Sequence, residues 1–124
     1  MKTLILAGLA GALLATATAA AARDSHPDAD HCLRTQWLRN HTIGDDHTLY
    51  FDYNGRDVYR LTASNNCLAA ATSSDPLVMQ DRSQGMMCRP IDWDISVRGT
   101  RCIITSMTKL SPAEVAALPK GKRP

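Results

Sequence analysis

The chain has few of the residues, and none of the short motifs, from which catalytic sites are usually recognised. Its 124 residues contain a single Glu, Glu114, and four His, all of which precede Tyr50. A glutamate pair for glycoside hydrolysis is therefore impossible. No Gly-x-Ser-x-Gly, His-Glu-x-x-His or phosphate-binding glycine motif is present. We expect no enzyme; the alternative is a hydrolase or metal-handling protein whose site is assembled from residues distant in the sequence.

No apolar run in the chain reaches the roughly 20 residues that a membrane-spanning helix needs. The longest run begins after Met1 and Lys2 and is followed by the small residues Ala20, Ala21 and Ala22. This order is typical of a secretory signal peptide, which is removed during export. The expected parts are a signal peptide over 1–22, a disordered segment over 23–31, a single β-rich domain over 32–119 and a basic tail over 120–124. We expect the mature protein in the periplasm or the medium, without a membrane span.

Alternating apolar and polar residues, separated by turn residues, predict five or six short antiparallel strands. The expected strands cover 32–39, 47–53, a partner strand that includes Val58, 77–79, 91–97 and 101–108. Asn54 and Gly55 tolerate the positive φ of a type I′ turn, so they predict a two-residue hairpin loop. That loop would pair Phe51 with Val58.

The second predicted hairpin joins strand 91–97 to strand 101–108. Its first strand alternates strictly between apolar and polar residues, which predicts one buried face and an outer face carrying Asp92 and Asp94. Arg98 and Gly99 form the expected turn.

An even number of cysteines, all in the exported part, predicts two disulfides. The absence of a Cys-x-x-Cys pair argues against zinc. The second hairpin would place Cys102 opposite Ile95 and leave Cys88 roughly 20 Å away along its strand. Since a disulfide joins Cα atoms within about 7 Å, the pair Cys88–Cys102 is disfavoured, and Cys32–Cys67 with it. Of the two patterns that remain, we favour Cys67–Cys88 with Cys32–Cys102.

The last predicted element is a short helix. Ser111 can cap it, Pro112 suits its first position, and Glu114 lies three residues after the cap. Pro119 should end the helix after about two turns. We expect the basic tail over 120–124 to be solvated.

Several blocks of the sequence together resemble a family of small exported proteobacterial proteins that is catalogued as a domain of unknown function. These blocks are Cys32, Arg39-Asn40, Asp45-Asp46, Thr48-Leu49-Tyr50-Phe51, Gly55, Val58-Tyr59, Cys67, the two later cysteines, and the closing run 110–119. The resemblance covers roughly residues 32–119. It implies a bacterial envelope setting and brings no catalytic or binding residues.

Charge is distributed unevenly along the chain. Removal of the expected signal peptide takes away Lys2 and leaves thirteen basic and twelve acidic residues. The net charge of the mature chain therefore does not indicate a particular class of partner. Residues 23–81 hold five Arg against nine Asp, whereas 82–124 hold eight Lys or Arg against two Asp and one Glu. Either the two halves neutralise one another, or the second half forms a basic face for an anionic envelope polymer. The candidate residues for that face are Arg98, Arg101, Lys109, Lys120, Lys122 and Arg123.

Two groups of His and Asp are dense enough in the sequence to bind a divalent metal, but each has a simpler explanation. The first, which follows the expected cleavage site, consists of His26, Asp28, Asp30 and His31. The second consists of His41, Asp45, Asp46 and His47, of which the two Asp have a structural use in a turn. We expect no metal and no cofactor. Five aromatic residues are expected mainly in the core: Trp37, Tyr50, Tyr53, Tyr59 and Trp93.

The sequence thus predicts a mainly β domain, a small antiparallel sandwich or barrel with a short C-terminal helix and two disulfides. The favoured function is a non-catalytic binding or interaction module of the cell envelope, with an anionic polymer or another envelope protein as partner and without nucleic acid. A pocket that gathers His or Asp with perturbed pKa values would favour an enzyme. An exposed aromatic patch rimmed by Arg would favour binding.

Overall fold

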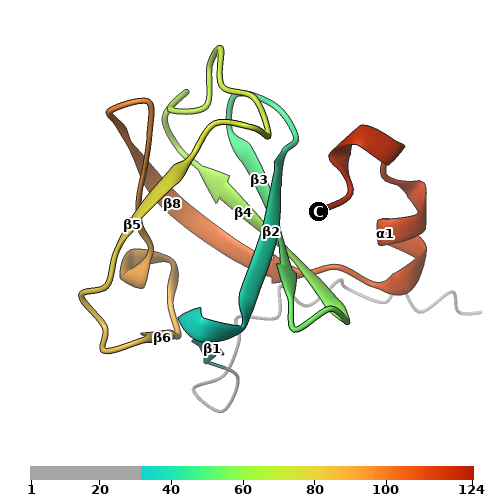
Figure 1. Ribbon diagram of the computed structural model, residues 1–124, viewed down its shortest axis with the longest axis horizontal. Coiled ribbons are helices and arrows are strands. Elements are labelled where there is room, and N and C mark those ends of the chain that lie inside the picture. The colour runs from blue at the N-terminus through green and yellow to red at the C-terminus, as the bar shows by residue number, and fades with distance from the viewer. Residues whose placement is uncertain (1–31) are drawn as a thin grey trace, which may run out of the picture.

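Six antiparallel strands form one sheet in the computed structural model, which describes residues 32–124. Their order across the sheet is β2 (Leu38–Ile43), β3 (Thr48–Tyr53), β4 (Asp57–Ala63), β8 (Thr100–Lys109), β7 (Asp94–Val97) and β5 (Leu77–Gln80). The sheet curls into a half-barrel, with β2 and β5 at its two edges (Figure 1). A two-stranded sheet of β1 (Leu33–Arg34) and β6 (Met86–Met87) lies at one end. The predicted mainly β, antiparallel fold is confirmed.

The core is built from strand residues that face the inside of the curled sheet. Phe51 stacks against Trp93 with ring centroids 5.5 Å apart, and both side chains are 2% exposed. Tyr59 is buried next to them in β4. The expectation that aromatic residues fill the core is confirmed for Trp93 and Tyr59 and is wrong for Trp37, which is 43% exposed.

The first hairpin has a three-residue loop, so the predicted register is wrong by one residue. Asn54 and Gly55 adopt the predicted positive φ, but Arg56 is an additional loop residue. Phe51 therefore pairs with Tyr59, and not with Val58. This register places Tyr59 on the buried face with Phe51 and turns Val58 to the other face, because directly opposed residues share a face.

The second hairpin has the predicted two-residue turn, and Ile95 pairs with Cys102 as expected. The strand before it is shorter than predicted, because Pro90–Asp92 form a 3-10 turn (η3) that leaves Ile91 80% exposed. The expected acidic outer face is wrong for Asp94. Its carboxylate is covered by two arginines, which leave the residue 6% exposed.

The predicted strand over 32–39 is interrupted. A 3-10 turn, η2 (Thr35–Trp37), separates β1 from β2, so that β1 pairs with β6 while β2 pairs with β3. The backbone N–H of Thr35 donates to the carbonyl of Gly85 at 3.0 Å, which anchors the change of direction.

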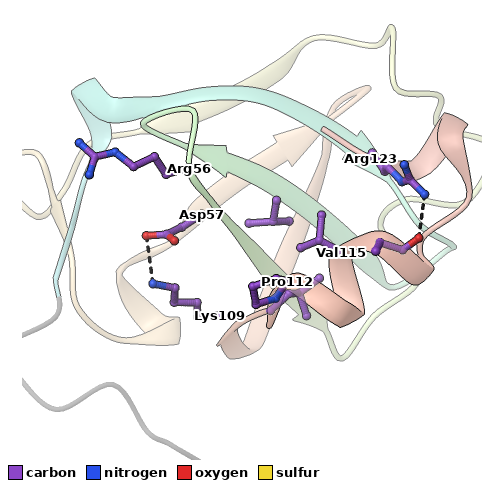
Figure 2. Close-up of a pocket in the computed structure, with 9 residues that line it drawn as sticks. Arg56, Asp57, Lys109, Pro112, Val115 and Arg123 are labelled. Atoms are coloured by element: carbon purple, nitrogen blue, oxygen red, sulfur yellow. Dashed lines mark hydrogen bonds and ion pairs between the residues drawn. The ribbon is translucent and has the colours of Figure 1, made fainter.

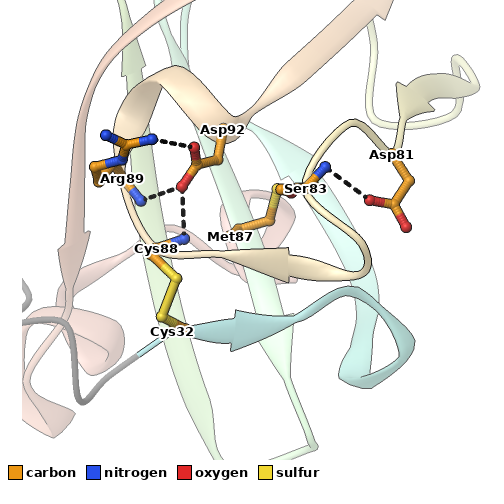
Figure 3. Close-up of polar contacts among 7 residues, drawn as sticks. All are labelled: Cys32, Asp81, Ser83, Met87, Cys88, Arg89 and Asp92. Atoms are coloured by element: carbon orange, nitrogen blue, oxygen red, sulfur yellow. Dashed lines mark hydrogen bonds and ion pairs between the residues drawn. A yellow bond between two sulfur atoms is a disulfide. The ribbon is translucent and has the colours of Figure 1, made fainter.

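The disulfides join Cys32 to Cys88 and Cys67 to Cys102, so the favoured pairing was wrong. The β1–β6 ladder explains the first bond, because Cys32 precedes β1 and Cys88 follows β6 (Figure 3). Cys67 follows β4, the neighbour of β8, and this adjacency explains its bond to Cys102. The exclusion of Cys88–Cys102 is confirmed. Two disulfides indicate an oxidising, non-cytoplasmic location.

Helix α1 (Pro112–Ala117) begins at the predicted cap. The backbone N–H of Glu114 donates to Ser111 Oγ at 3.2 Å, and the N–H of Ser111 donates to the Glu114 carboxylate at 2.7 Å. None of the residues of α1 is buried. No helix among residues 32–124 is long and apolar enough to cross a membrane.

The basic tail is part of the fold, so its description as a solvated tail was wrong. It forms a 3-10 turn, η4 (Lys120–Lys122), against β2. Lys122 Nζ donates to the carbonyl of Ile43 at 2.8 Å, and Thr42 Oγ1 donates to the carbonyl of Lys122. Arg123 donates to two carbonyls at the end of α1, which have no partner within the helix.

Candidate functional site

A groove of about 450 Å³ lies between α1 and the adjoining ends of β4 and β8 (Figure 2). Its lining combines five apolar residues, three cations and one carboxylate. These residues are Val58, Leu110, Pro112, Val115 and Ala116; Arg56, Lys109 and Arg123; and Asp57. The volume is typical of small-molecule sites.

The local sequence explains why the groove stays open. The backbone N–H of Leu110 donates to the carbonyl of Val58 at 2.8 Å, which extends the β4–β8 ladder by one bond. The chain then turns at the Ser111 cap and runs into α1. Because Val115 is the one residue of α1 that is even half-buried, the helix meets the sheet with little of its surface. The space between them forms the groove.

The floor of the groove is apolar. Leu110 is 5% exposed, and Val58 and Val115 are half-buried. Val115 projects from α1 into the space between the helix and β4 (Figure 2). The one-residue shift in the first hairpin is what turns Val58 toward this side of the sheet. The floor can therefore contact an apolar part of a ligand.

Three cations surround this floor. Lys109 Nζ lies 3.0 Å from the Asp57 carboxylate, and the hydrogen bond to Asp57 raises the pKa of the Lys109 ammonium group. Arg123 is held over the end of α1 by its bonds to Ala116 and Leu118. Arg56 is exposed and takes part in none of the ion pairs of the described chain. Since Asp57 neutralises only one of the three, the groove carries an excess of positive charge.

This lining does not contain the parts of a hydrolytic centre. It offers one carboxylate, no histidine and no hydroxyl or thiol nucleophile. What it can do is hold a ligand that combines an apolar portion with a negative charge.

The structure divides the six predicted basic residues between separate places. Lys109 and Arg123 line the groove, whereas Lys122 is docked on β2. Arg101 lies at the other end of β8, roughly 26 Å from Lys109 along an extended strand. Arg98 belongs to the same distant end and pairs with Asp75 at 3.4 Å. The structure therefore does not gather the six residues into one cluster. Lys120 is exposed on η4.

Arg56 was missed by the sequence analysis. The sequence feature that could have identified Arg56 as a groove residue is its position immediately after the Asn54-Gly55 turn. With the predicted two-residue loop it would have been an ordinary strand residue, whereas the three-residue loop places it at the mouth of the groove.

A small aromatic patch at the β1–β6 end consists of the exposed Trp37 and the half-buried Tyr53. The Arg34 guanidinium carbon lies 5.5 Å from the ring centroid of Trp37, and Tyr53 contacts the same ring edge-on at 5.9 Å. Met86, 41% exposed, pairs with Arg34 in the ladder.

Of the two groups of His and Asp, only the second lies within the described residues. Residues 32–124 contain no cluster of three or more His, Cys, Asp or Glu that could hold a metal ion. Within the second group, His41 Nε2 contacts the carbonyl of Asp75, and His47 Nδ1 contacts that of Asn65. The first group and the expected signal peptide lie outside the described residues.

Comparisons of the chain with protein-family models, with curated proteins and with solved structures find no match. The resemblance to exported proteobacterial proteins stays a prediction.

Proposed function

We propose that this chain is a non-catalytic binding module of the bacterial cell envelope, and that the groove beside α1 holds an amphipathic anion. The observation that carries the proposal is the pairing of an apolar floor with three cations, of which only Lys109 has a carboxylate partner. Burial of apolar ligand surface contributes about 25 cal/mol per Å². The cations also attract the negative charge of the ligand, and salt weakens this attraction because the groove is open to solvent.

The proposed location follows from two independent features. The two disulfides favour an oxidising compartment. The charged start, apolar run and small residues at the beginning of the chain are those of an export signal. Together they support a periplasmic or secreted protein.

The test compares decanoate with decanol, which have carbon chains of the same length and differ in charge. Calorimetric titration should show binding of decanoate that weakens as salt is added, and much weaker binding of decanol. An Arg56→Gln variant should weaken decanoate binding about tenfold, because it removes a charge-assisted contact. Lys120→Gln is the matched control, since Lys120 is an exposed neighbouring cation outside the groove.

Equal affinities for decanoate and decanol would contradict the role of charge. Unchanged decanoate affinity in Arg56→Gln would contradict the proposed location. Binding of polygalacturonate that Arg56→Gln weakens, with no binding of decanoate, would replace the amphipath by a polymeric anion in the groove.

A further inference from the structure

A buried carboxylate joins two exposed arginines on the outer side of the β5–β7–β8 region. Arg82 Nε lies 2.7 Å from Asp94 Oδ2, and Arg101 Nε lies 2.9 Å from Asp94 Oδ1. The Asp94 side chain is 7% exposed, whereas those of Arg82 and Arg101 are 67% and 66% exposed. The carboxylate is thus covered by the arginines that it holds.

The charges in this cluster do not balance. One carboxylate faces two guanidinium groups, whereas Asp92 and Asp75 each face a single arginine. Apart from Asp94, the only side chain between residues 32 and 124 that bonds either guanidinium is Gln80, whose Oε1 accepts from Arg82 at 3.2 Å. The cluster therefore retains one positive charge and exposed N–H donors.

Asp94 does not use its full bonding capacity either. Its Oδ2 atom is buried and receives no directed hydrogen bond from the described residues, although Arg82 Nε lies close to it. The contact is an ion pair in which the N–H of Arg82 does not point at the oxygen. A guanidinium group has five N–H donors, and among the described side chains those of Arg82 make one directed hydrogen bond, to Gln80.

The strand register places two exposed apolar side chains on the same face as the cluster. Val78 lies in the same row as Ser96 and Arg101, and Ile103 lies in the next row with Gln80 and Asp94. Val78 and Ile103 are 57% and 58% exposed. Apolar neighbours reduce the water around a bound ion, which strengthens charge-assisted hydrogen bonds.

We propose that Arg82 and Arg101 form a second binding site, specific for an oxyanion, in which Asp94 acts as the positioning residue. The planar guanidinium groups present donors with the spacing that carboxylate and phosphate oxygens accept. This site is independent of the groove, since it lies at the opposite end of β8 from Lys109. The same chemistry occurs in free phosphate and in the carboxylates of an anionic polymer.

The test follows the side-chain Nε–Hε signals of the arginines by NMR during titration with inorganic phosphate and, separately, with oligogalacturonate. The signals of Arg82 and Arg101 should shift together and saturate. Arg101→Gln should weaken binding at least about tenfold, as loss of a charge-assisted pair requires. Arg101→Lys should also weaken it, because an ammonium group lacks the planar fork. Arg89→Gln is the matched control, since Arg89 also pairs with an aspartate on an exposed surface.

Saturation by phosphate identifies a small-anion site, and saturation by oligogalacturonate alone identifies a polymer site. Shifts that spread equally over all arginines, or equal losses in Arg101→Gln and Arg89→Gln, would overturn the proposal. The amide spectrum of each variant shows whether the sheet is intact, so a loss of binding can be distinguished from a loss of fold.

Discussion

The ammonium group of Lys122 donates a hydrogen bond to the carbonyl of Ile43 at 2.8 Å, joining two residues that are 79 positions apart. Together with the bond from Thr42 to the Lys122 carbonyl, it fastens η4 to the edge strand of the sheet. The C-terminal segment is therefore a structural part of the domain and carries Arg123 into the groove.

Lys122→Met should lower the free energy of unfolding by about 1–2 kcal/mol, because it leaves a half-buried carbonyl without its donor. Urea unfolding measures the change. Lys120→Met is the control, since Lys120 is exposed on the same turn. Equal stabilities of the two variants would contradict the docked tail.

Non-reducing peptide mapping should recover Cys32 with Cys88 and Cys67 with Cys102. Replacing either pair by Ala should cost about 4 kcal/mol, since both bonds close long loops and restrict the unfolded chain. Recovery of a Cys67–Cys88 peptide would contradict the β1–β6 pairing, because that pairing requires Cys88 beside Cys32.

Acid should weaken the segment around η3 through Asp92. Burial acts to raise the pKa of Asp92, but backbone N–H groups of Arg89 and Cys88 and the Arg89 guanidinium outweigh it and hold the pKa below its ordinary value of 3.8 (Figure 3). A carboxyl with a depressed folded-state pKa stabilises fully above its unfolded pKa and loses that contribution as pH falls through the folded value.

The stability of the parent protein should therefore fall between about pH 5 and about pH 2, and Asp92→Asn should reduce the size of that fall. Urea unfolding at both pH values gives the comparison. Asp46→Asn, which removes an exposed carboxylate that accepts no side-chain hydrogen bond in the described chain, is the control. A fall of the same size in Asp92→Asn and the parent would refute this role.

Ser111→Ala should destabilise the protein by about 1 kcal/mol through loss of the helix cap. Because α1 forms one wall of the groove, the same variant should also weaken decanoate binding. Ser106→Ala on β8 serves as the comparison, since Ser106 neither caps a helix nor lines the groove. Unaltered decanoate binding by Ser111→Ala would show that α1 is dispensable for the site.

Local sequence signals predicted the elements that depend on neighbours in the chain. The Ser111 cap and the turn at Arg98-Gly99 are set by backbone preferences of a few residues, and both were confirmed. The register of the first hairpin could not be read in this way. Asn54 and Gly55 can adopt positive φ in a two-residue loop or in a three-residue loop. The three-residue loop is formed because it places Tyr59 in the core.

Features that depend on long-range pairing were not predictable. The disulfides follow from the β1–β6 ladder, and two-residue strands leave no periodic pattern. Lys109 and Arg123 were among the six basic candidates, but the groove that they line was not predicted. The contribution of Arg56 depends on the hairpin register, and the position of Arg123 depends on the docking of the tail on β2.

Amide chemical-shift mapping during titration with decanoate tests the central proposal most directly. The proposal predicts saturable shifts that are largest for Leu110 and Val115, which line the groove, together with a shift of the Arg56 side-chain signal. Saturable shifts confined to the Trp37 patch or to the β7–β8 hairpin, with the groove residues unchanged, would contradict it.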